Sequence, residues 1–156
     1  MKVDAFWPRQ SGVDILLVSP AEADYTSLGH ILDRSGWKLY WALNCREASG
    51  LLQQHSIGVV ITAGELPDGN WKSLLEAVTR LPISPSLIVA SRLADECLWA
   101  EVLNLGGYDV LLTPFEPAEV FRVGSAAWRH WKSRLQTALV AGKTGYSWLR
   151  SEMPAA

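Results

Sequence analysis

The fold is decided by the stretch Val59-Val60-Ile61-Thr62-Ala63-Gly64-Glu65-Leu66-Pro67-Asp68-Gly69. Its first half is an apolar run rich in β-branched residues, which predicts a buried strand over 57–62. Its second half is a Leu-Pro-Asp-Gly sequence, which is typical of a turn. The residue four before the proline is Ala63, whose methyl group carries no nucleophile. The stretch therefore predicts a buried strand that ends in an unreactive side chain.

Outward from this strand, apolar strands alternate with segments of helical periodicity. The predicted strands are 13–18, 37–42, 57–62, 87–90 and 110–112, and the predicted helices are one that ends at Ser35-Gly36, then 46–54, 71–81, 95–105 and a long last helix opened by Pro117. Strands that are apolar on both faces and alternate with helices form parallel sheets covered by helices. We therefore expect an α/β flavodoxin-like three-layer sandwich with strand order 2-1-3-4-5 and an extended last helix.

Length and composition fit one globular domain. The chain has 156 residues, of which 49% are hydrophobic and 19% charged, and no apolar run approaches the roughly 18 residues of a membrane span. The start of the chain carries an early acid and a proline where a signal peptide needs an apolar stretch, so cytoplasmic residence is expected. The predicted organisation is an N-terminal extension over 1–12, a domain over 13–140 and a C-terminal tail over 141–156.

Charge and cysteine content exclude several classes of site. Residues 1–117 hold 8 Lys and Arg against 14 Asp and Glu, whereas residues 118–156 hold 6 against 2, so the end of the chain is basic. A solvated basic helix face is the ordinary explanation of such an imbalance. Cys45 and Cys97 lack metal-ligand spacing, and the three histidines form no cluster with them. No metal site and no cofactor is predicted.

Four segments in this order resemble response-regulator receiver domains over about residues 13–135. They are the opening stretch, 36–48, Leu87-Ile88-Val89-Ala90-Ser91 with the loop after it, and the run from Leu105-Gly106-Gly107 to Thr113-Pro114-Phe115-Glu116-Pro117. The resemblance implies that Ala63 stands where the family carries its phosphoacceptor aspartate. It also implies that Ser19 and Pro20 replace the acidic pair that holds Mg²⁺, and that Thr113 replaces a lysine. Ser91 retains the family's hydroxyl, and Val110 takes the position of a switching aromatic residue.

Each of these residues also has an ordinary structural interpretation. Ser19-Pro20-Ala21-Glu22 has the pattern of a capping box, with Ser19 as N-cap and Glu22 three residues later. Ser91 fits a turn hydroxyl bonded to nearby backbone. Glu65 and Asp68 are the only acids near the old acceptor position; Asp68 with Gly69 fits turn chemistry, and neither acid is expected to replace the acceptor.

Two surfaces are candidates for binding a partner. If Ala100 and Leu103 face the core, Trp99 points outward, where it would suit an interface; packing against the last helix is an equally good alternative. In the last helix, Phe121, Trp128 and Leu135 alternate at heptad spacing with Gly124, Trp131 and Ala138. The second half of this stripe has no obvious cover in the same domain, which predicts a homodimer or a partner helix. Folding back of Tyr146-Ser147-Trp148-Leu149 is the alternative.

The sequence thus predicts a stand-alone pseudo-receiver that acts as a phosphorylation-independent protein interaction module in signalling or transcriptional regulation. Its partner is a protein of unknown identity. A second hypothesis is an adaptor for nucleic acid or membrane that uses the basic segment Trp128-Arg129-His130-Trp131-Lys132, although no strong signal for either ligand is present. An enzyme is not expected, because no glycine-rich phosphate loop follows the first strand and no pair of nucleophile and base is identifiable.

Overall fold

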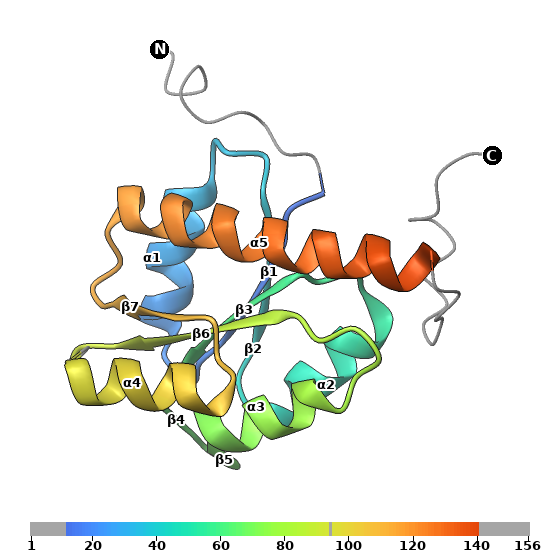
Figure 1. The fold of residues 1–156 in the computed structure, drawn as a ribbon. Helices are drawn as coiled ribbons and strands as arrows, with labels where there is room; N and C mark the ends of the chain where they lie inside the picture. The colour runs from blue at the N-terminus through green and yellow to red at the C-terminus, as the bar shows by residue number, and fades with distance from the viewer. Residues whose placement is uncertain (1–11, 94, 141–156) are drawn as a thin grey trace.

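The computed structural model describes residues 12–93 and 95–140, which form a parallel sheet between two layers of helices (Figure 1). The strand order is β2-β1-β3-β6-β7. Because β6 and β7 are the fourth and fifth strands predicted from the sequence, the order 2-1-3-4-5 is confirmed. The strands are β1 (Asp14–Val18), β2 (Lys38–Ala42), β3 (Val59–Ala63), β6 (Ser86–Ser91) and β7 (Asp109–Leu112).

Five helices cover the two faces of this sheet. Their bounds are α1 (Glu22–Leu32), α2 (Cys45–Gln54), α3 (Trp71–Thr79), α4 (Glu96–Leu105) and α5 (Pro117–Val140). Alternate residues along each buried strand point to opposite layers. Leu16 and Val60 pack with α2, α3 and α4, whereas Ile15 and Ile61 pack with α1 and α5. This alternation explains why the strands are apolar on both faces.

Side-chain caps that were not predicted set the starts of three helices. The side chain of Asn44 accepts from the Glu47 backbone N–H at the start of α2, and that of Asn70 accepts from two backbone N–H groups at the start of α3. Asp95 does the same for Leu98 in α4. Gly106, with a φ of +105°, ends α4 in the left-handed conformation that glycine adopts without a steric penalty.

The turn after β3 is more ordered than the sequence predicted. Two short strands, β4 (Glu65–Leu66) and β5 (Gly69–Asn70), pair antiparallel across the Pro67-Asp68 turn. The Trp71 N–H donates to the Gly64 carbonyl at 3.0 Å and closes the base of this hairpin. The end of β3 is thereby connected rigidly to the start of α3.

The second half of α5 is buried in its own domain, which corrects the expectation that nothing there would cover it. Trp131 is 1% exposed and Leu135 is fully buried, and both pack against Ile83 in the segment between α3 and β6. Gly58, just before β3, leaves the space for the indole, since a Cβ at residue 58 would lie 2.7 Å from Cδ2 of Trp131. Trp131 and Leu135 are therefore core residues and are not available to a partner.

The first half of α5 uses a glycine in the same manner. A Cβ at Gly124 would lie 2.9 Å from Cζ3 of Trp37, and the Trp37 ring meets Phe121 edge-on with centroids 5.1 Å apart. Trp128 is half-buried and joins the apolar clusters on both sides of it. The predicted stripe thus overlaps the buried face of α5: its first half borders the cluster on the sheet, and its second half packs against Ile83.

The chain contains no described helix that is both long and apolar enough to cross a membrane. The predicted tail over 141–156, with its possible fold-back of 146–149, lies outside the described residues, as does the predicted extension apart from Gly12.

Candidate functional site

Most residues that the resemblance singled out lie together at the carboxyl edge of the sheet, whereas Val110 lies within β7 and pairs with Val89. Val18 pairs with Thr62, Ala63 with Ala90, and Ser91 with Leu112. Side chains that end or follow these strands therefore share one edge: Ser19, Ala63, Ser91 and Thr113. In open parallel α/β sheets, ligands bind outside the carboxyl ends of the strands where the strand order reverses, which here is between β1 and β3.

Ser19 is bound internally rather than presented to a ligand. It is 1% exposed, its Oγ donates to Asp24 Oδ2 at 2.8 Å, and the same oxygen accepts from the Ala21 N–H at 3.1 Å. Its carbonyl accepts from the Trp41 indole N–H at 2.9 Å. Both the hydroxyl and the carbonyl of this residue are thus used to hold the start of α1 against β2.

The prediction of a capping box that begins at Ser19 is wrong. The N-cap of α1 is Ala21, whose backbone is extended and which makes no side-chain cap, and the helix begins at Glu22. Ser19 bonds two residues ahead, before the helix, so Glu22 is not placed to reach back to it. The helix start carries Glu22 and Asp24 in its first turn, where acids interact favourably with the helix dipole.

The other positions of the edge carry neutral groups that bond to one another. The Thr62 hydroxyl donates to the Ala63 carbonyl at 2.9 Å. Ser91 Oγ accepts from the Leu93 N–H at 3.0 Å, which confirms its interpretation as a turn hydroxyl. The Thr113 N–H donates to the Ser91 carbonyl at 3.0 Å. None of these groups is a carboxylate, and none carries a charge.

Asp68 has a structural role that the sequence did not reveal. Its carboxylate accepts from the N–H groups of Cys45 and Arg46 at 2.9 and 3.0 Å, so it ties the hairpin to the first turn of α2. These backbone donors hold the pKa of Asp68 below its ordinary value. Burial, followed by the charge of Asp68, raises the pKa of the Cys45 thiol to about 11. The Asp68 carboxylate is therefore engaged with a helix terminus, whereas Glu65 is exposed on β4 of the same hairpin.

This edge does not fit Mg²⁺, which the receiver family uses. A hard cation requires several carboxylate or carbonyl oxygens in octahedral geometry. Ser19 and Pro20 offer no carboxylate, Ala63 offers a methyl group, and Asp68 is bound to α2. Within the described residues, no three His, Cys, Asp or Glu side chains come together as a metal site would require. At these positions the chain therefore offers neither the carboxylate ligands of such a cation nor a carboxylate acceptor for a phosphoryl group.

Trp99 is exposed, which is one of the two orientations that the sequence left open, but the rest of α4 is rotated from the expectation. Leu98 and Val102 face the core, with Val110 of β7 beside them. Ala100 and Leu103, which we expected inside, are exposed. The Trp99 side chain is 50% exposed, and its indole N–H donates to Asp109 Oδ1 at 3.3 Å. Contact with β7, rather than with the last helix, therefore orients this side chain.

Comparisons with known proteins support the resemblance at the level of fold. No protein-family model matches the sequence, and no curated protein matches it. The signal receiver domain of an HD domain-containing protein from Pseudomonas fluorescens is 26% identical with a TM-score of 0.72, covering 80% of this chain and 92% of its own. A Francisella response-regulator receiver domain is 19% identical with a TM-score of 0.69, covering 76% and 98%.

A third solved structure, the beryllofluoride-activated NtrC4 receiver domain dimer, is 21% identical with a TM-score of 0.68 and covers 76% of this chain and 98% of its own. The chain thus has the receiver-domain fold of response regulators, and the family predicted from the sequence is supported. Ser19, Ala63 and Thr113, at which the resemblance placed the family's site positions, lie at the carboxyl edge of this fold, and Pro20 follows Ser19.

Proposed function

We propose that the chain is a pseudo-receiver: a non-enzymatic protein interaction module of two-component-type signalling or transcriptional regulation that works without phosphorylation. The observation that carries this proposal is the chemistry of the carboxyl edge. Each position at which the family would hold a metal or a phosphoryl group carries a neutral side chain here, and Asp68 is bound to α2. A receiver fold that does not undergo phosphorylation would act by binding a partner through its surface.

The surface that we favour is formed by α4 and β7. Trp99 and Leu103 of α4 are exposed by 50% and 38%, and Leu112 of the neighbouring strand β7 is exposed by 58%. Partly exposed tryptophans are over-represented among the residues that dominate protein interfaces. The NtrC4 receiver domain is a dimer in its activated form, which gives one precedent for association by this fold. A protein partner, including a second copy of this chain, fits an apolar patch of this kind.

Substitution of Trp99 by Glu tests this surface. Self-association is measured by sedimentation velocity, and binding to proteins of the native source is measured by quantitative affinity capture. We expect the variant to lose about ten- to a hundredfold of the affinity, because a central tryptophan contributes about 2 kcal/mol or more to an interface. Far-ultraviolet circular dichroism should be unchanged, since half of the side chain is in solvent.

Leu43→Glu is the matched control, because Leu43 is 40% exposed but lies between β2 and α2, away from α4. It should bind as the wild type does. Equal loss of binding in both variants, or no loss in Trp99→Glu, would show that the α4–β7 surface is not the interface.

The hypothesis of an adaptor for nucleic acid or membrane is weakened by the packing of α5. Trp131 is in the core, and the ring of Trp128 is half-buried with the Lys132 ammonium 5.8 Å above it. The aromatic side chains of this segment are thus occupied within the domain. A binding constant that is independent of salt concentration would exclude this function, because contacts to phosphates release counterions.

A further inference from the structure

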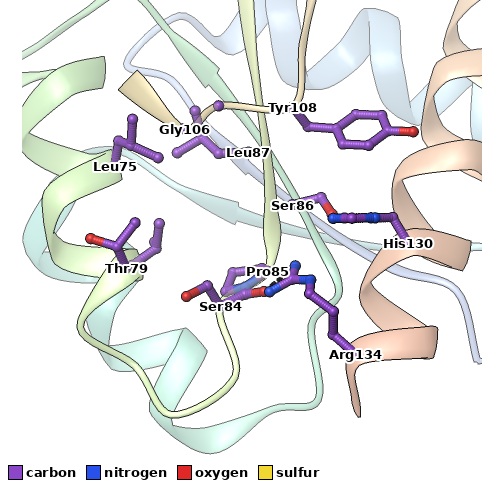
Figure 2. Close-up of a pocket in the computed structure, with 12 residues that line it drawn as sticks. Leu75, Thr79, Ser84, Pro85, Ser86, Leu87, Gly106, Tyr108, His130 and Arg134 are labelled. Atoms are coloured by element: carbon purple, nitrogen blue, oxygen red, sulfur yellow. Dashed lines mark hydrogen bonds between the residues drawn. The ribbon is translucent and has the colours of Figure 1, made fainter. Parts of the chain in front are cut away.

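A cavity of about 270 Å³ opens at the amino edge of the sheet, at the opposite end of the strands from the degenerate acceptor edge. Its walls come from four parts of the fold, as Figure 2 shows: the end of α3, the start of β6, the turn between α4 and β7, and the middle of α5. In this view Leu75 and Thr79 of α3 lie on one side and His130 and Arg134 of α5 on the other, with Ser86 and Leu87 of β6 between them.

The charge of the lining is one-sided. Arg134 carries a permanent positive charge and His130 is the other basic side chain, whereas none of the lining residues is an aspartate or a glutamate. Arg134 donates to the Ser84 carbonyl at 2.7 Å, and its buried Nε has no hydrogen-bond partner in the described part of the chain. No carboxylate among the described residues forms an ion pair with this guanidinium. A single hydrogen bond to a neutral carbonyl does not fully offset the free-energy cost of partly burying a charged guanidinium.

Desolvation at this position lowers the pKa of Arg134 from its ordinary value, although the group stays protonated at any physiological pH. A charge that has lost part of its hydration interacts more strongly with an anion than a fully solvated charge does. The guanidinium also presents a planar set of five N–H donors, which matches the geometry of a carboxylate.

The carboxyl ends of α3 and α4 border the cavity and bring partial negative charge to it. Backbone donors already bind the carbonyls nearest to the opening: the Leu81 N–H donates to Val78, and the Gly107 N–H donates to Val102. These caps reduce the opposing field of the helix ends. The full charge of Arg134 therefore determines the sign of the ligand that the cavity prefers.

The remaining walls are apolar and aromatic. Leu75, Val78, Pro85 and Leu87 are buried side chains at the cavity, and the Tyr108 and His130 rings lie with centroids 5.5 Å apart at one side. The cavity is slightly smaller than the range of about 300 to 1,000 Å³ that holds drug-sized ligands. It is suited to a single ring or a short chain with one polar end.

We propose that this cavity binds a small organic monocarboxylate, with its carboxylate on Arg134 and its apolar body against Leu75, Val78 and Leu87. Benzoate is the probe, and its neutral isostere benzamide is the matched control. Binding is followed by amide chemical shifts in ¹H–¹⁵N NMR spectra, chiefly those of Ser86, Gly106 and Gly107. We expect saturable shifts with benzoate and affinity at least about tenfold lower with benzamide, because a hydrogen bond to a charged group is lost.

Inorganic phosphate is the second probe, because it carries negative charge without an apolar body. Its affinity should be well below that of benzoate. Equal affinity for phosphate would mean a general anion site and would overturn the assignment to organic carboxylates. Equal affinity for benzamide, or shifts that do not saturate, would overturn the role of Arg134.

Arg134→Met keeps the length of the side chain and removes its donors, so it should abolish benzoate binding. Arg129→Met is the control, because Arg129 lies exposed on the same helix and does not line the cavity; it should bind as the wild type does. Thr79→Phe places a ring at the mouth from an exposed position of α3. It should block benzoate even if Arg134→Met does not fold, and undiminished binding to Thr79→Phe would place the benzoate elsewhere.

Discussion

Replacement of Trp131 by alanine tests the packing of the last helix most directly. The indole is 1% exposed and packs against Ile83 and Leu135. Truncation of a buried tryptophan to alanine costs about 3–5 kcal/mol, from lost burial and from the cavity that remains. A domain of this kind unfolds with a free energy of about 5–15 kcal/mol, so this single change removes a large share of it.

The measurement is urea unfolding followed by circular dichroism. With a dependence of about 2 kcal/mol per molar urea, the midpoint should fall by roughly 1.5–2.5 M. Trp99→Ala serves as the control, since the same residue type is half in solvent there, and its midpoint should change by much less. A midpoint unchanged in Trp131→Ala, together with a change from dimer to monomer, would refute the core assignment and restore the interface predicted from the sequence.

A double-mutant cycle tests the contact itself. Gly58→Ala introduces a methyl group against the indole, where a Cβ would lie 2.7 Å from Cδ2 of Trp131, and we expect a cost of about 1–3 kcal/mol from overpacking. In Trp131→Ala this cost should largely vanish, because the ring that the methyl group meets is gone. Strict additivity of the two free-energy changes would contradict the contact.

Three further outcomes follow from the carboxyl edge. Treatment with acetyl phosphate and Mg²⁺ should leave the intact mass unchanged, and Ala63→Asp should still not be phosphorylated efficiently because the metal-binding acids are absent; a labile adduct on Glu65 or Asp68 would contradict the pseudo-receiver. An alkylating reagent at mildly basic pH should label exposed Cys97 well before Cys45, whose pKa of about 11 keeps it a thiol. Because the folded-state pKa of Asp68 is lowered, its contribution to stability is present above the unfolded pKa and is lost as the pH falls through the folded value. Acid titration of unfolding should show this loss in the wild type and not in Asp68→Asn, and identical profiles would refute the tie to α2.

Strand order and most element boundaries were predictable because the central strands are apolar on both faces and strands alternate regularly with helical segments. The short strands β4 and β5 were not, since two-residue strands show no periodicity. The hydrogen bonds from Asp68 to the start of α2 were not predictable either, because they join residues far apart in the sequence. The turn pattern already explained an aspartate at residue 68, so nothing pointed to a second role. The predicted orientation of α4 was wrong for another reason. Leu98, Val102 and Leu103 are all apolar, so periodicity could not show which of them faces the core, and packing against β7 decides it.

The sequence indicated a buried face on the last helix, of which Gly124, Trp131 and Leu135 are buried, but it did not indicate what covers that face. Heptad spacing shows that one face of a helix is buried without showing what buries it. Here Ile83 packs against the helix, and Gly58 leaves room for the Trp131 ring. Nothing in the sequence around residue 83 or residue 58 predicts contact with the last helix.

The two pairs in which a glycine receives a tryptophan, Gly58 with Trp131 and Gly124 with Trp37, have an evolutionary consequence. Within each pair the volume of one side chain limits that of the other, so a change at one position is tolerated best after a compensating change at its partner. Related sequences should therefore show covariation of small and large residues at 58 with 131, and at 124 with 37. A homologue with a side chain at 58 should carry a smaller residue than tryptophan at 131.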